Sequence, residues 1–174
     1  MRRSEFNKHI NLLNEEELKQ ELITLFSKLN AVKQYYIMEL GGDEERKIIY
    51  KKAKENIASK YATKSYRKPK RPRIQKVNTI INRLKNDAVF PFEMIDIYLF
   101  NAETAIQFQR EYAYDSKPLY NTIISSYSKA LDLISSEKMH NVYEDRCTSV
   151  LRISYSLPWV YIKLLNINKK VYNK

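Results

Sequence analysis

Glycine, proline and cysteine are scarce in this chain of 174 residues, which contains two, five and one of them respectively. All-β folds need many tight turns, which are rich in glycine and proline. The shortage of both residues therefore argues against an all-β fold and favours long elements with few connections. The single thiol, Cys147, cannot form an internal disulfide, and nothing else in the sequence points to an oxidising compartment.

The chain also lacks a long apolar run. No stretch approaches the roughly 20 apolar residues that a membrane-spanning helix needs. The segment Met1–Glu5 contains two arginines, but no apolar segment follows, so it lacks the pattern of a secretory signal. We therefore expect a cytoplasmic protein that has no membrane partner.

Apolar residues recur at spacings of three and four along most of the chain, which is the pattern of helices that bury one face. The first stripe can break between Ser27 and Asn30 into two helices. We predict an all-α fold of seven or eight antiparallel-packed helices in one compact or mildly curved helical bundle, because short connections make neighbouring helices antiparallel. The stripes run over Leu18–Leu40, Tyr50–Tyr61, Ile74–Leu84, Phe92–Ile106, Tyr120–Ile134, Met139–Leu151 and Trp159–Leu165.

Capping residues indicate where some helices begin and end. Asn14 and Glu17 have the spacing of a capping box, in which each side chain bonds the backbone of the other residue. Gly41 and Gly42 end the stripe that follows, because glycine adopts the left-handed conformation of a helix end at little cost. Asp43 is then expected to cap the next helix.

The chain is basic, with 31 Lys and Arg against 20 Asp and Glu and a formal net charge of +11. Eight of these cations lie between Lys60 and Lys76, a segment that contains no acid, and its two prolines cannot continue a helix. We therefore expect a single helical domain over residues 1–174, with a basic inter-helix loop at residues 62–73 and a polar tail at residues 166–174.

The basic segment has two main interpretations. Its cations could neutralise phosphates while Tyr61 and Tyr66 stack on unpaired bases, which would make it a nucleic-acid or polyanion site. It could instead be a solvated inter-helix loop kept mobile by self-repulsion, with Tyr61 completing the stripe of the helix before it. The candidate polyanion-binding residues are Lys64, Arg67, Lys68, Lys70, Arg71, Arg73 and Lys76.

One cluster has the composition of a metal site or a catalytic site. His140, Glu144 and Cys147 share one side of a predicted helix and could bind zinc or form a thiol–imidazole pair. Cys147 also continues an apolar stripe, where a free cysteine behaves as a small core residue. The second explanation is simpler, so we predict no metal ligand.

Carboxylates offer a further possible site. Asp96 and Glu103 lie two turns apart on one predicted helix and, with Asp115, could supply an acid–base pair. Because cations are plentiful, a solvated helix face is the simpler interpretation. No phosphate-binding glycine loop and no hydrolase or metalloprotease motif occurs, so we predict no catalytic residue, no enzyme activity and no cofactor.

Tyrosine is abundant, with 14 residues. A ring that carries a hydroxyl suits a half-buried interface, so these residues could line a partner surface or close the rim of the core. Trp159, which follows Pro158, is expected to anchor the last helix. The tyrosines concerned are Tyr35, Tyr36, Tyr112, Tyr114, Tyr120, Tyr155 and Tyr161.

Several segments occur in an order that is typical of one group of proteins. They are Leu13–Leu18, Val32–Tyr36, Lys68–Lys70, Pro118–Asn121, Lys129–Leu131, Arg146–Cys147 and Trp159. This order resembles a family of uncharacterised bacterial all-helical proteins, a domain of unknown function. None of the segments is a catalytic signature, and the resemblance implies an all-helical cytoplasmic protein with no established activity.

The sequence departs from that family at two places. The loop before Pro118 has one acid, Asp115, where the family carries several. Pro158 and Val160 flank Trp159, where the family tends to carry glycine and a His-Asp pair. No functional residue is therefore transferred from the resemblance.

These observations predict a binding module. We expect first a protein-interaction domain that uses aromatic surface between helix pairs to bind a protein partner or a second copy of the chain. The alternative is nucleic-acid or polyanion binding through residues 60–76.

Overall fold

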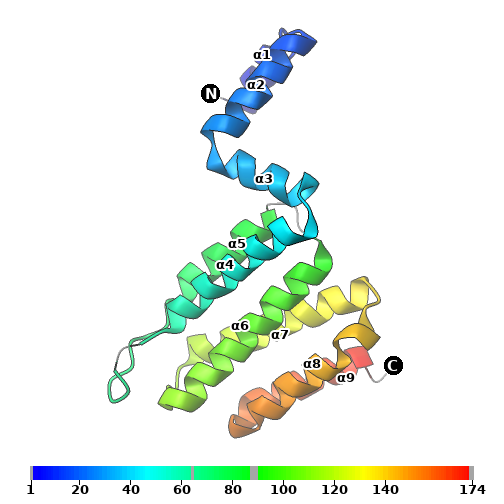
Figure 1. Cartoon of the computed structure of the whole chain (residues 1–174). Helices are drawn as coiled ribbons and strands as arrows, with labels where there is room; N and C mark the ends of the chain where they lie inside the picture. The colour runs from blue at the N-terminus through cyan, green and yellow to red at the C-terminus, as the bar shows by residue number, and fades with distance from the viewer. Residues whose placement is uncertain (1, 64, 87–89, 173–174) are drawn as a thin grey trace. The chain divides into compact units, whose positions relative to one another are not determined.

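The computed structural model describes residues 2–63, 65–86 and 90–172 of the chain. Over these residues it contains nine α-helices, one short 3₁₀ helix and no strand, which confirms the all-α class (Figure 1). Contacts divide the chain into two compact units, Met1–Arg46 and Lys47–Lys174, where the sequence predicts one domain.

The first unit contains α1 (Arg3–Ile10), α2 (Glu15–Lys28) and α3 (Asn30–Leu40). Helix α1 brings the number of helices above the prediction. It escapes prediction because its eight residues include only two apolar ones, Phe6 and Ile10, which are too few to form a stripe. The predicted capping box starts α2: Asn14 Oδ1 accepts the Glu17 amide at 2.9 Å, and Glu17 Oε2 accepts the Asn14 amide at 2.8 Å. Leu29 has extended backbone and separates α2 from α3 within the predicted interval.

Gly41 ends α3 for a different reason from the predicted one. Its φ of −70° and ψ of 154° are extended and not left-handed. A Cβ at Gly41 would lie 2.2 Å from the carbonyl oxygen of Ile37, so only glycine fits this close approach. Asp43 is the first residue of the next helix and not its cap, while Glu45 accepts the Gly42 amide at 3.1 Å.

The second unit is built around a central helix. It comprises α4 (Asp43–Tyr61) from Lys47 onward, α5 (Ile74–Asn86), α6 (Pro91–Tyr112), α7 (Lys117–Ser136), α8 (His140–Ile153), the 3₁₀ helix η1 (Ser154–Ser156) and α9 (Pro158–Tyr172). Helix α6 packs against α5, α7 and α8, and α7 also packs against α9 (Figure 1). The predicted stripes form this core, and Ile95, Leu99, Ile123 and Leu131 are fully buried in it.

The end of the chain differs from the predicted polar tail at residues 166–174, because α9 continues through Tyr172. Two polar side chains of this segment have partners inside the unit: Asn168 Nδ2 donates to the Tyr127 hydroxyl at 2.8 Å, and the Tyr172 hydroxyl donates to the His140 carbonyl at 3.3 Å. These bonds hold the last turns of α9 against α7 and α8. Among the described residues, no helix is both long enough and apolar enough to cross a membrane.

Candidate polyanion-binding site

Residues 62–73 connect α4 to α5 and are called the basic loop below (Figure 1). Two hydrogen bonds hold its arms together near the helices. The Arg73 amide donates to the Lys60 carbonyl at 3.0 Å, and the Lys70 amide donates to Thr63 Oγ1 at 3.1 Å. Pro72 is buried beside them. The basic loop is therefore closed at its base.

The predicted cations are exposed wherever the structure describes them. Lys64 lies outside the described residues. Lys76 lies in the first turn of α5. The remaining described cations of the set lie in the basic loop, directly before that helix. No acid occurs from residue 56 to residue 86 to neutralise them locally. The exposed cations are Arg67, Lys68, Lys70, Arg71, Arg73 and Lys76.

The two tyrosines of the basic segment have different environments. Tyr61 is 4% exposed, and its hydroxyl donates to Asn101 Oδ1 at 2.9 Å, while Asn101 Nδ2 donates to Ser126 Oγ at 2.8 Å. The stacking role for Tyr61 is therefore wrong, because it is a core residue that joins α4 to α6 and α7. Tyr66 is 71% exposed, and its ring centroid lies 5.6 Å from that of Tyr112.

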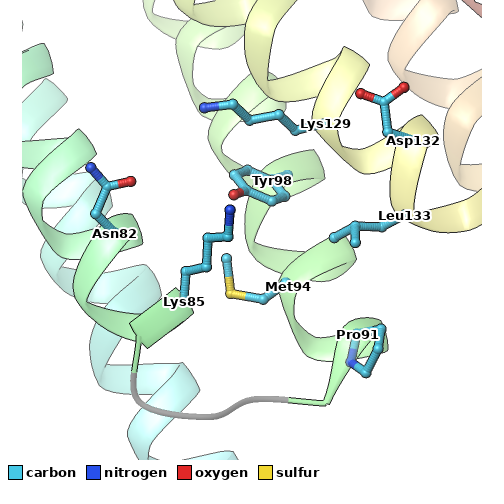
Figure 2. A pocket seen from close by; sticks show the side chains of 8 residues that line it. All are labelled: Asn82, Lys85, Pro91, Met94, Tyr98, Lys129, Asp132 and Leu133. Carbon is cyan, nitrogen blue, oxygen red and sulfur yellow. The ribbon is translucent and has the colours of Figure 1, made fainter. Parts of the chain in front are cut away.

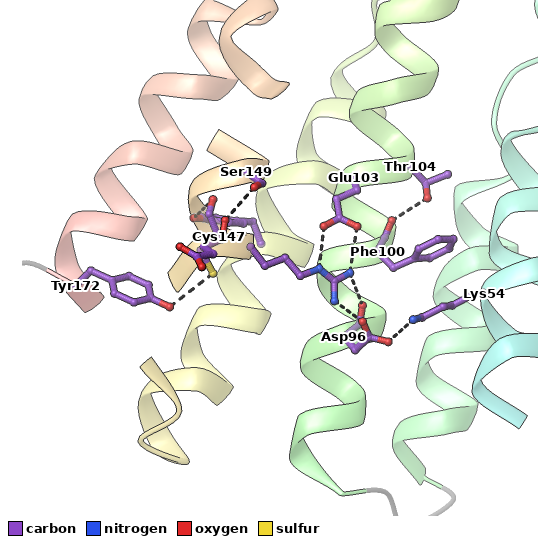
Figure 3. A network of polar contacts seen from close by, with 11 residues as sticks. Lys54, Asp96, Phe100, Glu103, Thr104, Cys147, Ser149 and Tyr172 are labelled. Atoms are coloured by element: carbon purple, nitrogen blue, oxygen red, sulfur yellow. Dashed lines mark hydrogen bonds and ion pairs between the residues drawn. The ribbon is translucent and has the colours of Figure 1, made fainter. Parts of the chain in front are cut away.

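The carboxylates Asp96 and Glu103 share one arginine, which sequence reasoning did not single out (Figure 3). Arg146 of α8 binds Glu103 through two parallel hydrogen bonds, Nε to Oε1 at 2.9 Å and Nη2 to Oε2 at 3.1 Å. It also pairs with Asp96, whose second oxygen pairs with Lys54 of α4. Asp115 lies apart from this group, in the connection from α6 to α7.

The electrostatics of this network differ from those of an acid catalyst. Burial alone would raise the pKa of Asp96, but the hydrogen bonds from Lys54 and Arg146 outweigh it and place that pKa below its ordinary value. A general acid needs the opposite shift near neutral pH. The group is thus an ion-pair network that joins α4, α6 and α8. Its bonded partners lie 42 to 50 residues apart, so no local spacing in the sequence could reveal it.

The cluster of His140, Glu144 and Cys147 has a structural explanation. Cys147 is fully buried, and its sulfur lies 3.7 Å from the Tyr172 hydroxyl oxygen. Burial raises the pKa of the Cys147 thiol, which disfavours the thiolate that a nucleophile or a zinc ligand requires. In the part of the chain that the structure describes, no group of three His, Cys, Asp or Glu side chains could hold a metal ion.

A second exposed feature lies on η1 and α9. Tyr155, Trp159 and Ile162 are more than half exposed and are called the aromatic surface below. Tyr155 packs against Tyr161 with ring centroids 4.5 Å apart, and Trp159 against Tyr120 at 6.4 Å. The side chain of Trp159, predicted to anchor the last helix, is 54% exposed and contacts α7 through Tyr120.

Comparisons with known proteins give a family without an assigned role. No curated protein and no solved structure matched the chain. A family model of unknown function, DUF6155, matches residues 1–172, in agreement with the resemblance of the segments described above to an uncharacterised family. The chain belongs to this family of unknown function, DUF6155.

Proposed function

We propose that the chain binds polyanions, and nucleic acid in particular, through the basic loop and Lys76. The observation that carries this proposal is a set of six exposed cations on a segment that is free of acids and closed at its base. Such cations neutralise backbone phosphates and release the counterions condensed on them, which is the main source of affinity for nucleic acid in general.

The closed base supports this proposal because it lowers the cost of binding. A free basic tail would lose conformational entropy when it follows a phosphate backbone, at about 1–2 kcal/mol per ordered residue. Here the backbone bonds at Arg73 and Lys70 already fix the arms of the loop. Tyr66 adds an exposed ring on the same loop, and rings of this kind can stack on an unpaired base.

The proposal is tested by fluorescence anisotropy with labelled single-stranded RNA and duplex DNA across a salt series. The loop variant replaces Arg67, Lys68, Lys70, Arg71 and Arg73 with glutamine. If about five cations meet phosphates, the slope of log affinity against log salt should be roughly −4 to −5 for the duplex and should flatten in the variant.

A charge-matched control separates a site from general basicity. The control variant replaces five other exposed cations with glutamine, namely Lys28, Lys52, Arg152, Lys169 and Lys170. Both variants have the same net charge, so only a local site distinguishes them. Equal slopes for the two variants would contradict the proposal, as would wild-type affinity in the loop variant.

A second candidate, protein interaction, is favoured by the aromatic surface. Large exposed aromatic side chains such as Trp159 are typical anchors of protein interfaces. For binding of a second copy through this surface, sedimentation should show concentration-dependent association that persists at high salt. The double change Tyr155→Ser and Trp159→Ser should abolish that association, and a monomer at all concentrations would contradict it.

A further inference from the structure

The cationic character of the basic loop continues along the next helix. Helix α5 follows the loop directly and contains Lys76, Arg83 and Lys85 but no acid. All three cations are exposed. With a rise of about 1.5 Å per residue, α5 extends the basic region by roughly 20 Å beyond the loop.

A groove with both polar and apolar walls runs beside α5. It consists of two adjoining cavities of about 430 Å³ and about 380 Å³, which share Asn82, Tyr98 and Lys129 in their walls. One cavity reaches Ile74, the residue that follows the basic loop, and the other reaches Pro91. The groove therefore begins where the loop ends and follows α5 along most of its length.

Three helices form the groove. Helix α5 contributes Asn78, Asn82 and Lys85 to one wall, at spacings of four and three that place them on one face. Helix α7 contributes Asn121, Ser125 and Lys129 to the other wall at regular spacings of four. Figure 2 shows Met94 and Tyr98 of α6 between these walls, and the Lys129 ammonium lies 5.7 Å from the centre of the Tyr98 ring.

The groups on the walls suit an unpaired nucleotide strand. Asn78, Asn82 and Ser125 are exposed, and their amide and hydroxyl groups can both donate and accept hydrogen bonds, as the edges of unpaired bases require. Lys85 supplies a cation for the strand's phosphates. Asp132, the single acid among the described lining residues, lies on α7 and disfavours phosphate on that side.

We propose that this groove binds single-stranded nucleic acid, with the bases against the amide and hydroxyl groups and the phosphates on the α5 side. The proposal rests on the polyanion-binding function of the basic loop and specifies its substrate class. A duplex keeps the Watson–Crick edges of its bases paired inside the helix, so it would engage the loop cations without using Asn78, Asn82 or Ser125.

The test uses a groove variant that removes hydrogen-bonding groups and no charge: Asn78→Ala, Asn82→Ala and Ser125→Ala. Its matched control is Asn56→Ala, Asn141→Ala and Thr148→Ala, at exposed helical positions outside the groove. The ligands are a labelled oligouridine of about 12 nucleotides, within the usual range of single-strand sites, and a DNA duplex of equal length.

The groove variant should bind the oligouridine about tenfold more weakly than wild type, because three modest hydrogen bonds are lost together. Its affinity for the duplex should stay within about twofold, and its salt slope should be unchanged since no cation is removed. Oligouridine containing 4-thiouridine should crosslink to α5 or α7 in the wild-type chain, which tests the groove without any variant.

Other outcomes overturn the inference separately from the proposed function. If the groove variant weakens both ligands equally, or neither, while the loop variant still weakens both, the groove is not a single-strand site and the loop proposal stands. If polyglutamate or uridine monophosphate displaces the oligouridine as effectively as unlabelled oligouridine does, the groove does not recognise a strand. Wild-type binding by the loop variant would overturn the proposed function itself.

Discussion

Replacing Arg146 tests whether the ion-pair network stabilises the second unit. Arg146→Met keeps an unbranched side chain but removes the guanidinium that joins α8 to α6 through Glu103 and Asp96. After the change, Asp96 retains Lys54, whereas Glu103 loses both bonds that Arg146 donates to it.

The expected loss follows from the geometry. A hydrogen bond to a charged group contributes about 1.5–3 kcal/mol, and breaking a fully buried ion pair from one side costs about 3–5 kcal/mol. The three side chains are each 30% exposed, so water recovers part of this loss. We therefore expect Arg146→Met to lower the free energy of unfolding by about 2–3 kcal/mol. Arg146→Lys, which keeps the charge without the paired geometry, should lose about half as much.

The assay is urea unfolding followed by tryptophan fluorescence. Trp159 is the sole tryptophan and lies in the second unit, so its emission reports on the unit that holds the network. Arg152→Met, an exposed change on the same helix, is the control and should alter stability by less than about 0.5 kcal/mol. An equally small effect of Arg146→Met would refute the reasoning.

The network also predicts how stability depends on pH. The folded-state pKa of Asp96 is lowered, so the paired carboxylate contributes stability above its unfolded pKa, and this is lost as pH falls through the folded pKa. An unfolded aspartate has a pKa of about 3.9. The difference in unfolding free energy between wild type and Arg146→Met should be full at neutral pH and should narrow below about pH 4. A difference that stays constant down to about pH 2 would contradict this assignment.

Three further predictions concern single positions. Asn101→Leu should destabilise the second unit by about 1–3 kcal/mol in the same urea assay, because Tyr61 and Ser126 each lose their buried partner. The Cys147 thiol should react with a disulfide reagent only when urea unfolds the chain, since it is buried and its pKa is raised; rapid labelling of the native protein would refute this. Gly41→Ala should destabilise the first unit by about 1–3 kcal/mol, because the new Cβ would clash with the Ile37 carbonyl. Gly42→Ala is the control and should be neutral, because its Cβ would enter open space. Hydrogen exchange of the first unit measures both effects.

Local patterns in the sequence predicted most of the helices. Contacts between residues far apart in the chain could not be predicted from it. The capping box at Asn14 could be predicted because its partners lie three residues apart. Apolar stripes such as the one along α7 could also be predicted, because their residues recur at spacings of three and four. Helix α1 could not be predicted, since two apolar residues, Phe6 and Ile10, are too few to form a stripe.

The candidate sites divide in the same way. The cations of the basic loop could be predicted from the sequence, because they form a run without acids and two prolines in that run exclude a helix. The groove could not, because Asn82 and Ser125 come together only when α5 and α7 lie beside α6. Arg146 was missed for the same reason, since its partners Asp96 and Glu103 precede it by 50 and 43 residues.

The closed base of the basic loop has a consequence for how the loop can vary. The backbone bond from Arg73 to Lys60 and the buried ring of Pro72 fix the two ends where the loop leaves the helices. Exposed residues between those ends contribute little to the core, so their charge and length can change without altering the helices. The loop can therefore act as an exchangeable module. Replacing residues 65–69 with a sequence of different charge should therefore leave the melting temperature unchanged.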